Sequence, residues 1–363
     1  MQVGLDAFAA VGRGGNSTYS RELIVQLLAQ GANRYDLFVH AHDLFRRQFS
    51  GGNEMHVRLS PSYFPLPFLE KINEILLRAR ARMRGVEIFH FTNPLNYTPG
   101  HYKTVVTIHD LAFLHDKSWA KASPGKMFKE KLQQIRKADA IIAVSQATKQ
   151  DIIKQLGVPA TKITVVYEGA GKEYFPDSER PSVQGRYLLC VGQLQPRKNN
   201  RALIEAFSLV APKFPDLKLV FAGRSVSKEY LESLHAAARA ANLQEKVIFI
   251  HSADNADLRK LYSHAECLVY PSLFEGFGLP VLESFQCGVS VITSNLSSLP
   301  EVAGEAGLLV DPHSPQKIAE ALEQFLTDET LRNRLRAAIP AQLQKFSWER
   351  AARETAQVYA TLS

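Results

Sequence analysis

Short runs of apolar, β-branched residues alternate with longer helical stretches along this chain, and that alternation constrains its fold more than any other feature. Strands buried on both faces of a parallel sheet read as continuous apolar runs, and each is joined to the next by a crossover helix. The pattern therefore predicts an α/β protein with doubly wound parallel sheets. It occurs in both halves of the 363 residues, which predicts two Rossmann-like domains.

The expected elements are clearer in the second half of the chain than in the first. In the first half, a helix is expected at 17–30 and strands are expected at 2–6, 35–39, 87–91, 104–108, 140–144 and 163–166. In the second half, strands are expected at 187–191, 218–222, 247–250, 267–270, 289–293 and 308–310. Helices are expected there at 200–210, 228–240, 256–264, 279–286, 315–326 and 328–338.

Residues 168–185 are rich in glycine, proline and charge, a composition typical of a linker. We place the domain boundary within this segment, so that the N-terminal domain spans 1–175 and the C-terminal domain spans 176–345. A last helix, expected at 347–362, has no strand after it, and segment 346–363 is treated separately. Ligands of doubly wound domains bind beyond the carboxyl ends of the strands, so the site is expected in a cleft between the two domains.

The composition excludes several classes of protein. Hydrophobic residues make up 45% and charged residues 22%, which is typical of a globular chain and not of a disordered one. No apolar run reaches the roughly 18 residues that a membrane-spanning helix needs, and the first residues do not have the pattern of a signal peptide. The 3 cysteines lie in apolar contexts without metal-ligand spacing, and we interpret them as buried thiols in a cytoplasmic protein.

The net charge of +7 lies entirely in the first half of the chain. Residues 1–175 contain 23 Lys and Arg against 15 Asp and Glu, giving +8, whereas residues 176–363 contain 20 against 21, giving −1. A basic domain favours an anionic partner such as a membrane surface, a phosphorylated ligand or nucleic acid, although it can also serve solubility alone.

Glycine-rich turns follow three of the expected strands. Gly14 and Gly15 precede a helix, where backbone N–H groups and the helix dipole attract an anion. This turn matches neither G-x-G-x-x-G nor a Walker loop, and an ordinary flexible turn is the alternative. Gly192 ends the strand at 187–191, and Gly223, after the strand at 218–222, leaves room for a ligand to approach.

Four side chains have the chemistry of a site. Arg197 and Lys198 stand just before a helix, where they favour a diphosphate, although a solvated pair of cations is the alternative. His109 ends the strand at 104–108, where it can bind a ligand or serve only as a hydrogen-bonded packing residue. Glu275 is expected in a loop, where its carboxylate can accept hydrogen bonds from sugar hydroxyls.

The stretch FEGFGLPVLE, residues 274–283, holds a second carboxylate, Glu283, at the start of a helix. The helix rise separates it from Glu275, so the two are expected to reach different parts of one extended ligand. The alternative for Glu283 is a charge that only complements the helix dipole.

Taken together, these motifs resemble the retaining glycosyltransferases of family 4, which have the GT-B architecture. The resemblance spans nearly the whole chain and is strongest in its C-terminal half. The most specific match is the E-x7-E signature, Glu275 to Glu283, within SLFEGFGLPVLESFQCG. Further matches are GGNSTYSREL at 14–23, VTIHDL at 106–111, VGQLQPRKN at 191–199 and SNLSSLPEVAGEAGLLVDP at 294–312.

The resemblance implies a role for each of these residues. Glu275 would contact the donor hexose near the reacting carbon, Glu283 would hold the ribose hydroxyls, and Lys198 with Arg197 would bind the diphosphate. His109 would lie at the sugar end of the cleft and act with Glu275 and Lys198 in catalysis. The remaining donor-binding positions would be Gly14, Gly15, Gly192, Gly223, Phe277, Gly278 and Leu279. The last helix would pack back on the N-terminal domain.

The sequence departs from the family pattern at two places. Many relatives have arginine where this chain has Gln193, which leaves the diphosphate to Arg197 and Lys198. In the N-terminal loop, Asn16 and Ser17 replace the more usual apolar residue and glycine.

The resemblance implies a retaining transfer of a hexose from a nucleotide-diphosphate sugar. Mannose from GDP-mannose is favoured over a UDP-sugar, because residues 191–199 and 294–304 look most like those of mannosyltransferases. The chain has no D-x-D motif, so neither a metal nor any cofactor besides the nucleotide sugar is expected. The alternatives are another GT-B enzyme, such as an epimerase or a phosphorylase, or a membrane or nucleic-acid binding protein without catalysis.

The acceptor is expected to be a glycan or a lipid-linked sugar, used in cell-surface polysaccharide or glycolipid synthesis. Residues 61–84 and 117–137 are basic and partly amphipathic, which suits the anionic inner face of a membrane. A solvated pair of helices is the alternative reading of these segments. No nucleic-acid motif is present, and a cytoplasmic, peripheral protein is expected.

Overall fold

The computed structural model of the chain describes residues 1–10, 14–40, 57–63, 70–116, 119 and 126–363. The side chains of residues 40, 57–63, 70 and 126–130 are outside this description. The chain divides into two compact units. The N-terminal unit is Met1–Gly169 with Ser347–Ser363, and the C-terminal unit is Ala170–Phe346.

The N-terminal unit contains a seven-stranded parallel sheet in the order β3-β2-β1-β4-β5-β6-β7. Its strands are β1 Gln2–Asp6, β2 Arg34–His40, β3 Val57–Tyr63, β4 Ile88–Phe91, β5 Lys103–Ile108, β6 Ala140–Ala143 and β7 Ile163–Val165. Its helices are α1 Gly15–Gln30, α2 Glu70–Met83, α3 Ala112–His115, α4 Lys126–Ile135, α5 Gln146–Asp151 and α13 Trp348–Ala360. The central strands β4 and β6 are buried throughout, as their apolar sequences predict.

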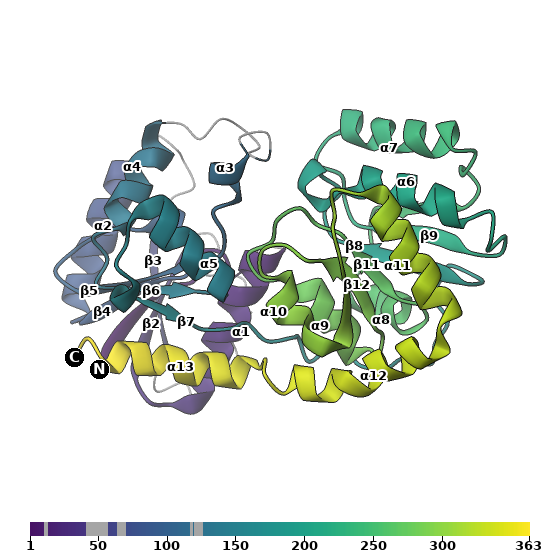
Figure 1. The fold of residues 1–363 in the computed structure, drawn as a ribbon. Helices are drawn as coiled ribbons and strands as arrows, with labels where there is room; N and C mark the ends of the chain where they lie inside the picture. The colour runs from purple at the N-terminus through teal and green to yellow at the C-terminus, as the bar shows by residue number, and fades with distance from the viewer. Residues whose placement is uncertain (11–13, 41–56, 64–69, 117–118, 120–125) are drawn as a thin grey trace. The chain divides into compact units, whose positions relative to one another are not determined.

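The C-terminal unit contains a six-stranded parallel sheet in the order β10-β9-β8-β11-β12-β13. Its strands are β8 Tyr187–Val191, β9 Lys218–Ala222, β10 Val247–Ile250, β11 Leu268–Tyr270, β12 Val291–Ser294 and β13 Gly307–Val310. Its helices are α6 Asn200–Val210, α7 Lys228–Ala240, α8 Asn255–Ser263, α9 Leu279–Gln286, α10 Leu299–Ala303, α11 Pro315–Thr327 and α12 Glu329–Leu343. Two doubly wound parallel sheets, one in each unit, confirm the predicted fold class (Figure 1).

The short helices α3, α5 and α10 were not expected from the sequence, and three further elements differ from the expectation for reasons that the structure shows. β3 was not expected, because its Pro61 interrupts the strand pattern; the strand lies at the sheet edge, where proline is tolerated. β12 begins two residues later than expected, because Val289 is held in the preceding turn by its N–H bond to the Ser284 carbonyl, at 3.0 Å. α12 continues past the expected end at 338 and through Pro340, since Gln342 donates to the carbonyls of Glu301 and Val302 and secures the last turn.

The segment 168–185, expected to be a linker, is attached to both units at its ends. Glu168 and Gly169 are buried in the N-terminal unit, where a Cβ on Gly169 would overlap the backbone of Ser347 and Trp348. Further along, Asp177 accepts a hydrogen bond of 2.7 Å from Arg259 of the C-terminal unit. The unit boundaries fall after residues 169 and 346, whereas the sequence placed them after 175 and 345.

The last helix, α13, belongs to the N-terminal unit, as the sequence predicted. It packs along α1, and Gln30 of α1 donates a hydrogen bond of 2.9 Å to the carbonyl of Glu349 (Figure 1). Its buried face consists of Trp348, Ala351, Ala352, Thr355, Val358 and Tyr359. In the part of the chain that the structure describes, no helix has both the length and the apolarity needed to cross a bilayer.

Candidate functional site

The candidate site lies where the strand order of the C-terminal sheet reverses. β8 and β11 are neighbours at the centre of that sheet, and the chain continues from them towards opposite edges. Such a switch point opens a crevice beyond the carboxyl ends of the two strands. The two loops that leave there are joined by the N–H of Leu273, which donates to the Arg197 carbonyl at 2.9 Å. The sequence pattern therefore placed both cationic and acidic motifs at the crevice of one sheet.

Glu275 is the centre of a charged cluster in this crevice. Lys198 Nζ lies 2.6 Å from its Oε1, and Arg197 Nη1 lies 3.3 Å from its Oε2. All three side chains are largely buried, with 12% of Lys198, 16% of Arg197 and 8% of Glu275 exposed. Burial by itself would raise the pKa of Glu275, but the charges of Lys198 and Arg197 outweigh it and hold that pKa below its usual value. Glu275 is therefore an ionised counter-ion of the two cations.

Lys198 and Arg197 are positioned by the backbone just before α6. They end a 3-10 turn, Pro196–Lys198, and Asn199 follows in the left-handed region with φ of 59°. The Asn199 amide anchors this turn by donating to the carbonyls of Pro271 and Pro312, at 3.2 and 2.6 Å. Arg197 also donates to the Phe274 carbonyl at 2.7 Å. The alternative of a solvated cation pair is wrong, because both cations are buried and paired with Glu275.

The loop around Glu275 is held by two serines. Ser297 Oγ accepts from the Glu275 N–H at 3.0 Å, and Ser298 Oγ donates to the carbonyls of Glu275 and Phe277. Gly278 caps the N-terminus of α9 with φ of 118°, and a Cβ there would lie 2.9 Å from Leu299 Cδ2. Glycine at 278 is thus required both by its backbone conformation and by packing. The Phe277 ring is buried and meets Phe346 edge to face, with 5.7 Å between centroids.

Glu283 lies at the start of the second turn of α9, which begins at Leu279, close to the first turn or so in which the sequence placed it. At this position the carboxylate gains little from the dipole of α9, because that electrostatic effect fades after the first turn of a helix. Its Oε2 accepts a hydrogen bond of 2.7 Å from the buried Tyr262 hydroxyl. Burial raises the pKa of Glu283 to about 7, and the nearby Glu173 adds to the rise.

Gly192 and Gly223 form a backbone contact beside Lys198. A Cβ on Gly223 would overlap the carbonyl oxygen of Gly192, which explains glycine at 223 without any ligand. A Cβ on Gly192 would lie 3.8 Å from Lys198 Cε, an ordinary contact, but the residue has φ of 127°. The two glycines therefore allow β8 and β9 to end close together next to the cations.

His109 belongs to the N-terminal unit, directly after β5. Its Nε2 lies 2.9 Å from the Thr92 carbonyl, and its Nδ1 lies 3.5 Å from Oε1 of Glu168. The ring meets Tyr19 of α1 edge to face, with 4.6 Å between centroids. Gly14 and Gly15 stand at the N-terminus of α1, and a Cβ on either would meet nothing within 4 Å. These glycines are thus not required by packing among the described atoms.

Sequence reasoning missed three residues that contact the predicted ones. Glu168 was assigned to the linker, yet it is 4% exposed and pairs with His109. Tyr270 ends β11 and accepts a hydrogen bond from Lys198, and its position at a strand end was a usable signal. Tyr262 lies inside α8, and nothing in its sequence context indicated that it would contact Glu283.

The three cysteines, Cys190, Cys267 and Cys287, are buried and free, as predicted. Burial raises the pKa of Cys287 to about 11, so its thiol is unreactive at neutral pH. Among the described residues, no three His, Cys, Asp or Glu side chains come together as metal ligands would.

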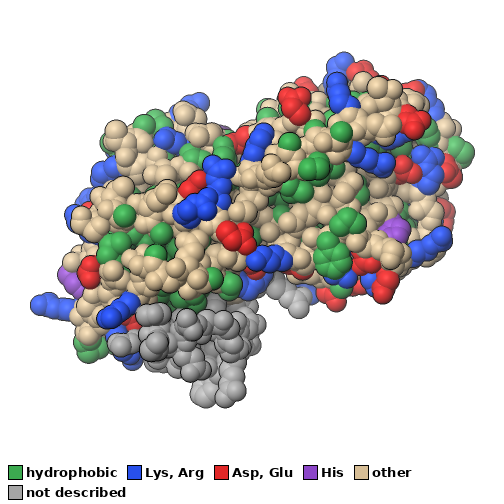
Figure 2. Space-filling view, turned by 90° about the horizontal axis from the view of Figure 1, so that it is seen from below, with side chains coloured by type: hydrophobic (Ala, Val, Ile, Leu, Met, Phe, Trp, Pro, Cys, Tyr) green, Lys and Arg blue, Asp and Glu red, His purple; other side chains and the backbone are tan. Residues whose placement is uncertain are grey.

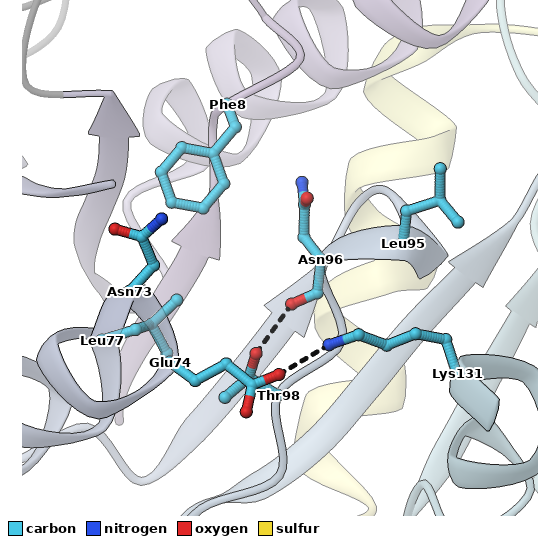
Figure 3. Close-up of a pocket in the computed structure, with 8 residues that line it drawn as sticks. All are labelled: Phe8, Asn73, Glu74, Leu77, Leu95, Asn96, Thr98 and Lys131. Carbon is cyan, nitrogen blue, oxygen red and sulfur yellow. Dashed lines mark hydrogen bonds and ion pairs between the residues drawn. The ribbon is translucent and has the colours of Figure 1, made fainter. Parts of the chain in front are cut away.

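The basic segments of the N-terminal unit are only partly described. The described cations include Lys131, which the sequence assigned to a basic surface; it is instead 8% exposed and bonds to Glu74 Oε1 at 2.8 Å. Figure 3 shows these two side chains pointing toward one another from α4 and α2, in a small pocket of about 20 Å³. Arg136 and Lys137 are exposed as expected. The remaining lysines of that segment, Lys117, Lys121, Lys126 and Lys129, lie outside the described residues or side chains.

Two family models match the chain one after the other. The model for Glycosyltransferase Family 4 matches residues 13–171, and that for Glycosyl transferases group 1 matches residues 172–342. The serotype-specific mannosyltransferase WbdA of Escherichia coli is 33% identical over 260 residues, 68% of this chain and 32% of WbdA. This chain thus spans about a third of the length of WbdA. The O-antigen chain mannosyltransferase B of Escherichia coli is 31% identical over 297 residues, 77% of this chain and 76% of that protein.

Several solved structures have the same fold and align with nearly the whole of this chain. Sucrose-phosphate synthase from Thermosynechococcus elongatus has a TM-score of 0.79 at 21% identity, covering 99% of this chain and 98% of that one. Anabaena HepE in complex with UDP and glucose has a TM-score of 0.78 at 16% identity, covering 99% and 100%. WaaG, a glycosyltransferase involved in lipopolysaccharide biosynthesis, has a TM-score of 0.74 at 14% identity, covering 98% and 99%. With the GT-B fold of these structures and its two family models in succession, the chain belongs to glycosyltransferase family 4.

Proposed function

We propose that this protein is a retaining, metal-independent mannosyltransferase. It would move mannose from a nucleotide-diphosphate sugar, with GDP-mannose favoured, to a glycan or lipid-linked acceptor in cell-surface polysaccharide synthesis. Family membership supports transfer of a sugar, and the similarity to the mannosyltransferase WbdA and the O-antigen chain mannosyltransferase B supports mannose and an O-antigen-like product.

The observation on which the proposal depends most is the cluster of Lys198, Arg197 and Glu275 at the switch point of the C-terminal sheet. Buried cations are costly unless an anion compensates them, and here Glu275 does so. The same cations suit a diphosphate, because a charge-assisted hydrogen bond to a phosphate oxygen is among the strongest available. Glu275 then remains beside the bound diphosphate, where its carboxylate can face the sugar attached to it.

This arrangement suggests how the chemistry proceeds. The bond between the anomeric carbon and the diphosphate oxygen breaks, and negative charge grows on the leaving phosphate. Lys198 and Arg197 stabilise that charge, as fixed dipoles and cations do in a site of low dielectric. Glu275 stabilises the positive charge that develops on the sugar. The acceptor hydroxyl attacks from the face that the phosphate leaves, and its proton passes to a phosphate oxygen, which gives retention.

Glu283 is proposed to hold the ribose of the nucleotide. An ionised carboxylate accepts two hydroxyl hydrogen bonds, whereas a protonated one offers fewer acceptor sites. Because burial raises the pKa of Glu283 to about 7, this acceptor forms fully only above neutral pH. The Tyr262 hydroxyl occupies Oε2 and leaves Oε1 for the ligand.

A panel of nucleotide sugars tests the proposal. GDP-mannose, GDP-glucose, UDP-glucose, UDP-galactose and UDP-GlcNAc are compared by thermal stabilisation and by slow hydrolysis, each with EDTA or Mg²⁺. We expect GDP-mannose to stabilise the protein most and to be hydrolysed equally well in EDTA. Preference for a UDP-sugar would redirect the donor assignment, as the UDP complex of HepE allows. Interconversion of two sugars without transfer would indicate an epimerase and refute the proposal.

The stereochemistry and acceptor need a second measurement. Mannosyl transfer to a mannose-terminated oligosaccharide is followed by NMR, and the anomeric configuration of the first product is read from its one-bond C–H coupling. We expect the α configuration of GDP-mannose to be kept. An inverted product would contradict the retaining mechanism.

We also propose that α2 contacts an anionic membrane surface on which a lipid-linked acceptor is held. On the side opposite its buried residues, α2 exposes 49% of Ile72, 61% of Ile75 and 76% of Met83. The exposed cations Lys71, Arg78 and Arg82 lie beside this apolar stripe. Apolar side chains next to cations are typical of helices that lie in a membrane interface. Over the face shown in Figure 2, in contrast, cationic and anionic side chains are interspersed.

Sedimentation with phosphatidylglycerol vesicles at low salt tests the membrane contact. We expect the wild-type protein to sediment, and the double variant Ile72→Asn/Ile75→Asn to remain largely in the supernatant. Val25→Asn is a matched control, since Val25 is a 43% exposed apolar residue on α1 of the same unit. Absence of wild-type sedimentation at low salt would rule the contact out.

A further inference from the structure

Tyr270 stands at the end of β11, beside the Lys198 ammonium of the C-terminal crevice. Its hydroxyl accepts a hydrogen bond from Lys198 Nζ, and the same Nζ donates to Glu275 Oε1 at 2.6 Å. Lys198 Nζ also lies 4.7 Å from the centroid of the Tyr270 ring. The ammonium is therefore held by two groups of different chemistry, a carboxylate and a tyrosine.

Tyr270 is itself fixed by the centre of the sheet. It is 1% exposed, and its carbonyl accepts a hydrogen bond of 2.8 Å from the hydroxyl of Thr293, its partner on the neighbouring strand β12. A lysine, in contrast, carries its charge on a flexible four-carbon stem and loses much rotamer freedom when it is held in one geometry. The rigid tyrosine thus offers a fixed oxygen to a side chain that is mobile by nature.

The tyrosine hydroxyl suits this task because it is neutral. Burial, followed by the charge of Glu275, raises the pKa of Tyr270 well above its usual value, so the hydroxyl keeps its proton. A second carboxylate at this place would compete with a diphosphate for the cation, whereas a hydroxyl leaves the charge of Lys198 available. An ammonium has three N–H donors. Among the described residues, Glu275 and Tyr270 take two of those of Lys198, which leaves the third for a ligand.

Glu275 cannot fix Lys198 by itself, because other groups share its carboxylate. Arg197 Nη1 lies 3.3 Å from Glu275 Oε2 and also donates to the Phe274 carbonyl. In the proposed transfer, the carboxylate of Glu275 also faces the sugar. The Tyr270 hydroxyl therefore supplies a partner for Lys198 that does not depend on where the Glu275 carboxylate is drawn.

We propose that Tyr270 is a positioning residue, whose hydroxyl fixes the Lys198 ammonium at the place where negative charge grows on the leaving diphosphate. Tyr270 acts through Lys198 and does not touch the nucleotide sugar itself. The inference rests on the proposed function for the part that Lys198 plays in transfer. The hydrogen bond between the two side chains is a property of the folded chain and can be measured without a substrate.

A double-mutant cycle tests whether Tyr270 acts through Lys198. Tyr270→Phe keeps the ring beside the ammonium and removes only the hydroxyl. We expect kcat to fall roughly tenfold or more, the size expected for a hydrogen bond to a charged group. The KM for the nucleotide sugar should change little, because the lost interaction matters most in the transition state. In the Lys198→Ala background, Tyr270→Phe should have little further effect, since the group that it positions is already absent.

Tyr187→Phe is the matched control, on the neighbouring strand β8. Tyr187 is also 1% exposed, and its hydroxyl donates to the Leu261 carbonyl at 2.7 Å. This change removes a buried hydrogen bond from the same sheet without touching Lys198, and kcat should stay close to that of wild type. A residue with only a structural role would lower kcat by the same factor with and without Lys198. That result, or a wild-type kcat in Tyr270→Phe, would overturn the proposal.

The NMR signal of the Lys198 ammonium tests the hydrogen bond without any sugar. Exposed ammonium protons exchange rapidly with water, whereas buried and hydrogen-bonded ones are protected and can be observed with ¹⁵N-labelled lysine. We expect a signal in wild type and in Tyr187→Phe that is lost in Lys198→Ala and is weaker or absent in Tyr270→Phe. An unchanged signal in Tyr270→Phe, or no Lys198 signal in wild type, would refute the positioning role.

The two measurements separate this inference from the proposed function. If no nucleotide sugar is turned over but the Lys198 signal depends on the Tyr270 hydroxyl, the pairing stands and the proposed function fails. If sugar is transferred but the loss of kcat in Tyr270→Phe does not depend on Lys198, the proposed function stands and Tyr270 has no positioning role. A circular dichroism melt of each variant shows whether the fold is intact.

Discussion

The two units share one topology but differ in the polar groups at the centre of their sheets. Both sheets place the first strand of the unit between the second and the fourth, so both have a switch point at equivalent places. In the C-terminal unit that point holds an ionic cluster, Lys198 and Arg197 around Glu275. In the N-terminal unit the equivalent region holds Asp6 at the end of β1, a buried carboxyl whose pKa is raised to about 6 by burial, beside a set of uncharged hydrogen-bonding groups.

The uncharged groups of the N-terminal unit form a buried chain from α13 to α1. The Tyr359 hydroxyl lies 2.7 Å from His90 Nδ1, His90 Nε2 lies 2.8 Å from the Thr107 hydroxyl, and that hydroxyl lies 2.9 Å from the Tyr19 hydroxyl. Such a network needs no counter-ion and fixes the helices on the sheet. The comparison suggests that one unit is built to bind charge, whereas the other is built to hold its own last helix in place. Five experiments test this comparison.

The largest effect is expected from Glu275→Ala and Lys198→Ala. Each removes one member of the ionic cluster, and we expect sugar transfer to fall roughly 10²- to 10³-fold, the size seen when one group that stabilises a transition state is lost. The measurement is kcat/KM with GDP-mannose, with the melting curve recorded in parallel. Glu245→Ala, at an exposed position of the same unit, is the control. Wild-type turnover in both variants would remove the C-terminal cluster from catalysis.

A second experiment compares glycines of the two units. Gly223→Ala should destabilise the protein by about 3 kcal/mol, because its Cβ would overlap the Gly192 carbonyl and the strand ends must move apart. Gly15→Ala should leave stability within about 0.5 kcal/mol, since its Cβ meets nothing. Urea unfolding measures both free energies. Equal losses of free energy of unfolding in Gly223→Ala and Gly15→Ala would show that the loop before α1 is packed as tightly as the loop after β9.

The third experiment concerns Glu283, whose pKa is raised from 4.5 to about 7. Below pH 4.5 the carboxyl is protonated in both the folded and the unfolded chain. Between pH 4.5 and 7 the folded chain keeps the proton that the unfolded chain loses, so the free energy of unfolding falls as pH rises, by up to about 3 kcal/mol. Urea unfolding across this range should show that slope in wild type and a weaker one in Glu283→Gln. If the free energies of unfolding of wild type and Glu283→Gln change with pH in the same way, a group other than Glu283 is responsible for the slope.

The fourth experiment concerns His90 in the N-terminal unit, which should change stability with pH in the direction opposite to Glu283. Its pKa is lowered from 6.5 to about 3, so the unfolded chain binds a proton that the folded chain refuses as pH falls below 6.5. Stability should therefore decrease toward pH 3. Hydrogen exchange resolved by segment can measure the stability of the two units separately at each pH. His90→Gln is the comparison for the N-terminal unit, in which the decrease should be weaker.

The smallest effect is expected from Tyr359→Phe. It leaves His90 Nδ1 buried without its partner, which should cost about 1–3 kcal/mol in free energy of unfolding. Tyr230→Phe in the C-terminal unit removes a hydroxyl that lies 3.4 Å from Asn200 Oδ1, and it should cost much less. Equal effects of the two changes would argue against a special role for the network that holds α13.

Several elements could be predicted from sequence because their signals are local. The apolar strands β8 and β9 were predicted at their observed bounds, and so were helices α6, α7 and α9. The E-x7-E motif and the Arg197–Lys198 pair could be assigned to one crevice, since parallel strands end at one edge of the sheet. The edge strand β3 and the end of α12 could not be predicted from the sequence, because their limits depend on neighbours that are distant in sequence.

The fold class, the family and the residues at the ends of the C-terminal strands follow from the sequence alone, because periodicity and motif spacing are properties of consecutive residues. Which of those residues meet depends on the tertiary structure. Lys198 contacts Glu275 across 77 positions, Tyr262 bonds to Glu283 from another helix, and Glu168 leaves the expected linker to face His109. These contacts depend on strand order and helix packing, and no local pattern encodes the distance between two side chains that the fold brings together.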